Sequence, residues 1–413
     1  MKIVLTNFGT VGEIYPLLAL AQELEESGHE AKIALSPDYE DWVTRLGLRF
    51  VSVGPPAKAI TTELTLAATR DPLVFESPKA SRELFRPLRE SIPAAYEQLR
   101  EACRGYDLLV SGHLQPAAKM VHETDGIPYV SLCATVISPG GTSPGYQRAT
   151  QSLVNPYRSK LGLSPVADPL AGDSLSDELA LYALSSHVLT RPASWPAFYH
   201  LVGYFHLHEE DWQPDGSLAD FLLSGPPPVV VAFGSMVLKN SDELTQILVR
   251  AGQEARCRVI IQQGWSGLGR QALPENMYSV GYAPHDWLFS RASCVVHHGG
   301  SGTSAAVFRA GVPAIFIPHI LDQPLWASCA QRLGVAGPEI SPSELTSQKL
   351  AAAIRTTTNN PRYGIAAKEL MTKIRSEHGT RRARLLIEQT YASKVRPSST
   401  QLSSRILRKP TIH

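Results

Sequence analysis

The chain has 413 residues, which is more than one ordinary hydrophobic core accommodates and suits two domains. Hydrophobic residues make up 43% of it and charged residues 19%, a composition that excludes a disordered or fibrous protein. Its 39 basic and 38 acidic residues almost cancel, so the net charge gives no general attraction to nucleic acid or to an anionic membrane. An anionic ligand would have to be held by a local site.

Five scattered cysteines show no spacing typical of a metal site or a disulfide framework. No apolar run is long enough to cross a bilayer, and the chain begins with a strand-like run instead of a signal peptide. We therefore expect a cytoplasmic protein without an integral membrane segment, which leaves peripheral contact with lipid open.

The N-terminal half alternates short β-type runs with segments of helical periodicity, as in βαβ units around a parallel sheet. The first strand is expected at 2–6, followed by a helix that opens near Pro16 and ends at Gly28. Residues 55–101 have a helical pattern with many breaks, whereas 138–169 are rich in Gly, Pro, Ser and Asn and predict a long loop. The pattern also predicts a helix at 39–46 and strands at 31–35, 49–53, 107–111 and 129–133.

A composition shift at 211–228, where polar residues lead into three prolines, marks the expected linker between domains 1–210 and 229–378. A C-terminal helix at 379–392 is expected to pack back toward the first domain, and the basic segment 393–413 to form a flexible tail. Two doubly wound α/β units in tandem are thus predicted. In the second unit we expect helices at 242–254 and 303–310 and strands at 229–233, 258–262, 278–281, 294–297 and 314–317.

The segment from His297 to Thr303, His-His-Gly-Gly-Ser-Gly-Thr, lies between a β-branched strand and a helix. Glycines allow a tight turn, and the N–H groups of the following helix terminus then point into the crevice beyond the sheet. A diphosphate suits this geometry, and a histidine beside it can donate a charge-assisted hydrogen bond. Glycines alone more often mark an ordinary βα turn, but the paired histidines favour an anion site.

Together with the residues after it, this segment resembles the donor-binding signature of the family 1 glycosyltransferases. These have the GT-B fold, in which two Rossmann-like domains face each other across a cleft. The similarity continues through Ala310-Gly311-Val312-Pro313 to Asp322-Gln323-Pro324-Leu325-Trp326, and it is closest to the bacterial natural-product, glycopeptide-type and sterol-type branch. Gly9-Thr10-Val11-Gly12 near the N-terminus is similar too, whereas 58–207 resembles the family least.

The resemblance implies donor-binding roles for ten residues. His297 is expected to contact the diphosphate of a nucleotide sugar, and Ser235 to meet the phosphates from the first strand of the second domain. Asp322 and Gln323 are expected to bind sugar hydroxyls, for which a carboxylate and an amide are chemically suited. Tyr282 is expected to stack on the base, which would not distinguish uracil from thymine. The backbone around the diphosphate is assigned to Gly299, Gly300, Ser301, Gly302 and Thr303.

Two of these residues have a structural alternative. Tyr282 could equally be a half-buried core aromatic at a strand end. Asp322 could cap a helix beginning at Pro324, a role that is compatible with sugar binding.

Transfer to a hydroxyl needs a base in the N-terminal domain. Many members of the family use a histidine in the first βα loop, but Val11 stands there in this chain. The glycopeptide-type and sterol-type branch has an aspartate after Gly-x-x-Gly, and Glu13 occupies that place. Just before a helix, Glu13 would be kept ionised and less basic by the helix dipole, and a purely capping role is the alternative. Thr10 and His113 are weaker acceptor-side candidates, since His113 follows the strand at 107–111 but could be a surface histidine.

The resemblance implies an inverting glycosyltransferase that moves a hexose from a UDP- or TDP-sugar to a hydroxyl of a small, largely apolar acceptor. Such an acceptor could be a natural product, a sterol or a phenolic. No metal and no other cofactor are implied, and a monomer or weak dimer is expected. A catalytically silent homologue that acts as a helper protein and a sugar-nucleotide epimerase or hydrolase are the alternatives. The donor residues Ser235, His297, Asp322 and Gln323 are all retained, which argues against the silent homologue.

Overall fold

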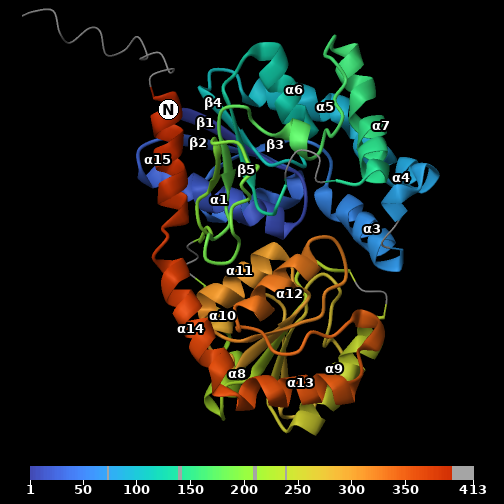
Figure 1. The fold of residues 1–413 in the computed structure, drawn as a ribbon, viewed down its shortest axis with the longest axis vertical. Coiled ribbons are helices and arrows are strands. Elements are labelled where there is room, and N and C mark those ends of the chain that lie inside the picture. Colours follow the sequence, from blue (N-terminus) through green and yellow to red (C-terminus); the bar gives the residue numbers. More distant parts are fainter. Residues whose placement is uncertain (72–73, 138–141, 208–211, 238–239, 393–413) are drawn as a thin grey trace, which may run out of the picture.

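The computed structural model of the protein describes residues 1–71, 74–137, 142–207, 212–237 and 240–392. Within these ranges the chain forms two α/β domains, one around a seven-stranded and the other around a five-stranded parallel sheet. Figure 1 shows the domains stacked along the long axis of the molecule, with the last helices running beside both. The predicted pair of doubly wound units is confirmed.

The first sheet has the strand order β3-β2-β1-β4-β5-β6-β7. Its order reverses between β1 and β4, which pair with Thr6 opposite Ser111. Ligands of doubly wound folds bind beyond the carboxyl ends of the strands at such a reversal. The strands are β1 (Lys2–Thr6), β2 (Glu30–Leu35), β3 (Arg49–Ser52), β4 (Leu108–Ser111), β5 (Tyr129–Cys133), β6 (Ala180–Tyr182) and β7 (Tyr199–Leu201). The helices are α1 (Val11–Glu26), α2 (Glu40–Arg45), α3 (Ala57–Arg70), α4 (Pro78–Leu84), α5 (Arg86–Ala102), α6 (Pro116–Asp125) and α7 (Pro144–Lys160), with 3₁₀ turns η1 (Pro37–Tyr39), η2 (Val74–Glu76) and η3 (Gly172–Ser174).

The second sheet repeats this topology with the order β10-β9-β8-β11-β12. Its reversal lies between β8 and β11, where Ala232 pairs with His297. The strands are β8 (Val229–Ala232), β9 (Val259–Gln262), β10 (Met277–Val280), β11 (Cys294–His297) and β12 (Ala314–Phe316). The helices are α8 (Gly216–Leu223), α9 (Ser241–Ala255), α10 (His285–Phe289), α11 (Ser301–Ala310), α12 (Gln323–Arg332), α13 (Ser347–Asn359), α14 (Pro361–Arg375) and α15 (Gly379–Tyr391), with the 3₁₀ turn η4 (Pro342–Glu344).

Continuous apolar runs form the central strands because helices cover both faces of each sheet. In β8, Val229 and Val231 belong to the core on one face and Val230 to the core on the other. All three are almost fully buried. A strand with one face in water would instead alternate apolar and polar residues.

Helix α1 begins at Val11, not near Pro16 as expected. Thr10 precedes it in an extended conformation, and its carbonyl accepts hydrogen bonds from the N–H groups of Glu13 at 3.0 Å and Ile14 at 3.2 Å. Pro16 therefore lies inside the helix, where its missing N–H forgoes one hydrogen bond. The expectation was wrong because proline is favoured in the first turn and so suggested a later start.

Helix α7 occupies most of the segment in which a long loop was expected, so that prediction was wrong. Ser143 caps the helix, since its Oγ accepts a hydrogen bond from the N–H of Tyr146 at 3.2 Å, and Pro144 takes the first helical position. Ala149 and Leu153, four residues apart, are buried in the core of the first domain. The Ser, Pro and Gly residues that suggested a loop are helix-start signals here.

The expected linker at 211–228 contains helix α8 in its described part. Asp215 caps this helix by accepting a hydrogen bond from the N–H of Leu218 at 2.7 Å, and the Leu218 side chain is buried. The expected tail, 393–413, and residues 138–141 lie outside the described residues.

Helices α14 and α15 run from the second domain to the first along one side of the molecule (Figure 1). Ala383, Ile387 and Tyr391 of α15 are fully buried in the core of the first domain. Arg384 Nε donates a hydrogen bond to Glu23 of α1 at 2.9 Å. The C-terminal helix thus contributes packing to the domain that holds the N-terminus.

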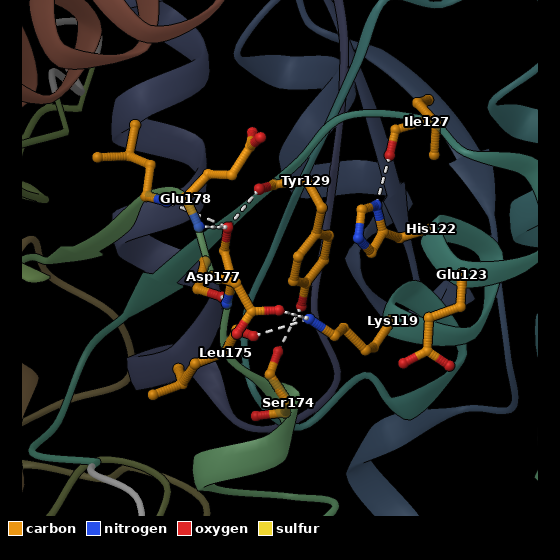
Figure 2. A network of polar contacts seen from close by, with 12 residues as sticks. Lys119, His122, Glu123, Ile127, Tyr129, Ser174, Leu175, Asp177 and Glu178 are labelled. Atoms are coloured by element: carbon orange, nitrogen blue, oxygen red, sulfur yellow. Dashed lines mark hydrogen bonds and ion pairs between the residues drawn. The ribbon is translucent and has the colours of Figure 1, made fainter. Parts of the chain in front are cut away.

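A network of polar contacts lies at the amino end of β5 (Figure 2), and α15 joins it through Tyr391. The Tyr391 hydroxyl donates to the backbone oxygen of Tyr129 at 3.0 Å, and the Tyr129 hydroxyl donates to the backbone oxygen of Ser174 at 2.9 Å. Lys119 Nζ donates to the backbone oxygen of Leu175 at 3.0 Å, and His122 stacks on the Tyr129 ring. Because Tyr129 begins β5, this network lies at the sheet edge opposite the carboxyl ends of the strands.

Candidate active site

The reversal points of the two sheets meet where the domains touch. A methyl group placed on Gly302 would lie 3.7 Å from Cα of Gly12, so the N-termini of α11 and α1 are in contact. Ser301 Oγ donates to the backbone oxygen of Ala134 at 2.5 Å. Figure 1 shows α1 and α11 at this junction. Residues from the carboxyl ends of both sheets can therefore act on one ligand.

Glu13 lies in the first turn of α1, at the domain junction. Its side chain is 20% exposed. Asn7, which follows β1, donates from Nδ2 to Glu13 Oε2 at 3.4 Å and to the Glu13 backbone oxygen at 3.3 Å. Thr10 is the N-cap residue of α1, and its side chain makes no capping hydrogen bond. A capping role for Glu13 stays an alternative prediction. The acceptor-side role expected for Thr10 stays a prediction.

The expectation that Glu13 would be kept ionised and weakly basic was wrong. Burial and, to a smaller extent, the nearby charge of Asp322 raise the pKa of Glu13 to about 7, against the opposing effect of the hydrogen bond from Asn7. The desolvation of a carboxylate therefore outweighs the field of the helix terminus. A carboxylate with a pKa near 7 suits general base catalysis at neutral pH.

His113, which could have been a surface histidine, is 9% exposed and lies beside Glu13. The distance from its Nδ1 to Glu13 Oε2 is 4.0 Å. Burial lowers the pKa of His113 to about 3, so the imidazole is neutral at neutral pH and the contact is not an ion pair. The surface alternative was wrong because β1 and β4 are neighbours, which brings the loops after them together.

His297 ends β11 with its ring buried against Phe316. Its Nδ1 accepts a hydrogen bond from the N–H of Gly299 at 3.2 Å, which assigns the ring proton to Nε2. Nε2 is buried and has no hydrogen-bond partner among the described residues. Burial lowers the pKa of His297 well below its usual value, so the ring is a neutral donor. The charge in any charge-assisted bond would come from the ligand.

The glycines after His297 are required by close packing. Gly299 has a φ of 88°, and a methyl group there would lie 3.0 Å from the backbone oxygen of Gln323. A methyl group on Gly300 would lie 2.4 Å from Nε2 of His298. Gly300 precedes α11, whose first N–H groups have no partner within the helix. The turn therefore presents backbone donors at the carboxyl end of β11, as a diphosphate site needs.

Ser235 follows β8, the strand next to β11, and is partly buried. A methyl group on the preceding Gly234 would lie 3.6 Å from the ring of His298 and 3.8 Å from Oγ1 of Thr303. The two loops at the second reversal point are thus in contact. This places Ser235 beside the segment from His297 to Thr303.

Asp322 links the two domains. It stands before α12 but makes no capping bond, so the capping alternative was wrong. Its Oδ2 accepts hydrogen bonds from Trp326 Nε1 at 2.6 Å and from Thr135 Oγ1, across the junction, at 2.5 Å.

Gln323 is buried, and its Oε1 accepts hydrogen bonds from the N–H groups of His319 at 2.7 Å and Ile320 at 3.0 Å. Its Nε2 contacts Met236 Sδ at 3.4 Å. The side-chain oxygen of Gln323 therefore fixes the backbone of the loop before α12.

Tyr282 follows β10 and is 59% exposed, so the half-buried core position was wrong. β10 is the outermost strand on its side of the second sheet, beyond β9 and β8. Tyr282 therefore lies toward one end of the carboxyl edge of this sheet. Its stacking role stays a prediction.

Sequence reasoning missed Asn7 and Thr135. Each is a polar residue just after a buried strand, a signal that could have singled them out. In the described part of the chain, no group of three or more His, Cys, Asp or Glu side chains could hold a metal ion. No helix within the described ranges has the length and apolar composition to traverse a bilayer.

Comparisons with known proteins identify the class. Residues 3–135 match the glycosyltransferase family 28 N-terminal domain, and residues 249–380 match the erythromycin biosynthesis protein CIII-like, C-terminal domain. The solved structure of glycosyltransferase VinC in complex with DTDP has a TM-score of 0.68 at 21% identity, covering 94% of this chain and 99% of that chain. The fold is thus the GT-B fold of glycosyltransferases, as the sequence motifs implied.

Two relatives of known activity identify the family to which the chain belongs. The O-mycaminosyltylonolide 6-deoxyallosyltransferase of Streptomyces fradiae is 30% identical over 94% of this chain and 97% of that protein. The sterol 3-beta-glucosyltransferase of Pichia angusta is 30% identical over 94% of this chain, which spans only 33% of that longer protein. The chain belongs to the family 1 glycosyltransferases and is an enzyme of that family.

Proposed function

We propose that the enzyme transfers a hexose, with inversion, from a UDP- or TDP-sugar to a hydroxyl of a small, largely apolar acceptor. One observation carries this proposal: Glu13, a carboxylate with a raised pKa, and the segment from His297 to Thr303 lie on opposite sides of the same domain junction. The first domain would bind the acceptor and the second the donor. No other cofactor and no metal are part of the proposal.

The donor would bind along the carboxyl edge of the second sheet. The buried Nε2 of His297 and the backbone N–H groups that begin α11 would donate to the diphosphate, with Ser235 beside them. Asp322 and the amide of Gln323 would meet the sugar, and exposed Tyr282 the base. The DTDP bound in the VinC structure supports a nucleoside diphosphate as this ligand.

The acceptor hydroxyl would approach from Glu13. As its oxygen forms a bond to the anomeric carbon, its proton passes to the Glu13 carboxylate, and the bond from the anomeric carbon to the phosphate oxygen breaks. The electron pair leaves with the nucleoside diphosphate. His297 and the α11 amides would stabilise the charge that develops there. A single displacement of this kind inverts the anomeric centre.

Aromatic side chains near Glu13 support an apolar acceptor. Phe75 stacks on Phe85 with ring centroids 5.5 Å apart and meets Tyr146 edge-on at 6.2 Å. Burial raises the pKa of Tyr146 to about 12, with a contribution from the negative charge of Glu13, so Tyr146 lies within its electrostatic reach. The relatives named for a tylonolide derivative and for sterols also support an apolar acceptor.

The experiment is a matrix of UDP- and TDP-hexoses against macrolide aglycones, sterols and phenolics, read by mass spectrometry for a gain of one hexose. The product linkage is then assigned by NMR. We expect transfer with inverted anomeric configuration and no change of the donor when it is incubated alone. Retained configuration would contradict the single displacement, and consumption of the donor alone would favour an epimerase or hydrolase.

A further inference from the structure

The loops after β1 and β4 pack unusually closely. A methyl group on Gly112 would lie 2.1 Å from the Asn7 side chain, so only glycine allows this approach. The approach brings Asn7 and His113 to the same carboxyl group of Glu13, one from each loop. Asn7 is in hydrogen-bond contact with that carboxyl group, whereas His113 Nδ1 is 4.0 Å away and has no partner among the described residues.

The chemistry of the two contacts is opposite. The Asn7 amide is a donor, so it stabilises the ionised carboxylate. If the proton of the neutral His113 ring is on Nε2, Nδ1 can only accept, and it then has no favourable bond with a carboxylate that also only accepts. Once Glu13 is protonated it becomes a donor, and closing the gap to an O–H···N bond requires a movement of about 1 Å.

We propose that His113 carries its ring proton on Nε2 and is a positioning residue for the base: its Nδ1 accepts a hydrogen bond from Glu13 only after Glu13 has taken the proton of the acceptor hydroxyl. The proposal rests on the proposed role of Glu13. The O–H bond of the acceptor breaks, and its proton moves to the Glu13 carboxylate and stays there. The new O–H group of Glu13 then turns to Nδ1 of His113. The protonated product state is stabilised, so Glu13 is a stronger base.

Other groups around Glu13 set the background for this effect. The charge of Asp322 favours the protonated form, as burial does, and Asn7 favours the ionised form. Five titratable groups interact with Glu13, each from a different element. They are Tyr39 in η1, His113 after β4, Cys133 in β5, Tyr146 in α7 and Asp322 just before α12. Burial raises the pKa of Tyr39, Cys133 and Tyr146, so these three stay neutral near pH 7.

The test compares His113→Leu with His113→Gln by the pH dependence of kcat/KM. Leucine keeps the site dry but removes the acceptor, so the acid-side midpoint should fall by about one pH unit. Glutamine offers a carbonyl oxygen and should restore the midpoint. Asn7→Leu is the matched control, in which the acid-side midpoint should shift in the opposite direction. It removes a hydrogen-bond donor to the carboxylate, and the midpoint should therefore rise. Donor affinity, measured by calorimetry, should stay unchanged in both His113 variants.

Two results would overturn the proposal. One is an unchanged midpoint in His113→Leu, or an equal shift in His113→Gln, either of which would mean that His113 only fills space. The other is a further loss of turnover when His113→Leu is added to Glu13→Gln, since His113 would then act without Glu13. If Glu13→Gln alone keeps near-normal turnover, the proposed base itself is wrong, a distinct outcome. If His113→Leu does not fold, His113→Met removes the acceptor in the same way.

Discussion

At the scale of single residues, we expect the protonation state of Glu13 to set the pH range of the reaction. Because burial raises its pKa to about 7, the carboxylate proposed to accept the proton is half ionised at pH 7 and fully present only at higher pH. We expect kcat/KM to fall as pH decreases through about 7, tenfold per unit on the acid side. A profile of kcat/KM from pH 5 to 9 measures this directly, and a midpoint near 4.5, the ordinary value for a glutamate, would contradict it.

His297 carries the second prediction at this scale. His297→Ala removes the buried Nε2 that we propose donates to the diphosphate, and it should weaken binding of the nucleoside diphosphate by about 1.5 to 3 kcal/mol. Calorimetry with UDP and TDP measures the loss. His122→Ala is the control, because His122 bonds the backbone oxygen of Ile127 in the network of Figure 2, away from the junction. Equal losses in both variants would indicate a general effect on folding.

The residues at the site differ in how far the sequence could predict them. His297, His298 and the glycines after them stand in one continuous segment, so the sequence itself predicts an anion site there. Asn7 and His113 approach Glu13 from loops that follow different strands, and only the pairing of β1 with β4 brings them together. The pKa of Glu13 was misjudged for the same reason, since burial depends on packing and not on position in a helix.

At the scale of elements, the strands were predictable because buried parallel strands are continuous apolar runs, as Val229 to Val231 illustrate. Helix α7 was not, since its starting residues, Ser143 to Gly145, have the composition of a loop. Its position depends on a contact made by tertiary structure: Ser143 Oγ donates to Glu76 of η2. A methyl group on Gly145 would lie 2.7 Å from Cα of Glu76, so η2 can pack there only against glycine.

This contact gives a prediction for the acceptor side. Gly145→Ala should push η2 and its Phe75 away from Tyr146, raising KM for the acceptor severalfold while donor affinity stays unchanged. Arg148→Ala, at an exposed position of the same helix, is the control. Steady-state kinetics with each substrate varied in turn separate the two effects. A change in donor affinity alone would contradict an acceptor role for these helices.

At the scale of the whole molecule, α15, which follows the second domain in the chain, packs into the core of the first domain. Ile387 is fully buried there, so Ile387→Ala should cost about 2 to 5 kcal/mol and lower the midpoint of thermal unfolding. Gln389→Ala, at an exposed position of α15, should leave the midpoint within error. Equal midpoints for the two variants would mean that α15 does not stabilise the first domain.

In the proposed mechanism both domains are needed, because the proposed base and the proposed donor site belong to different sheets. The account as a whole stands on the role of Glu13, and Glu13→Gln tests it most directly because glutamine keeps the shape but accepts a proton poorly. Turnover measured with saturating donor and acceptor should fall by about 100-fold or more, with donor affinity and the unfolding midpoint unchanged. Near-normal turnover in Glu13→Gln would contradict the account.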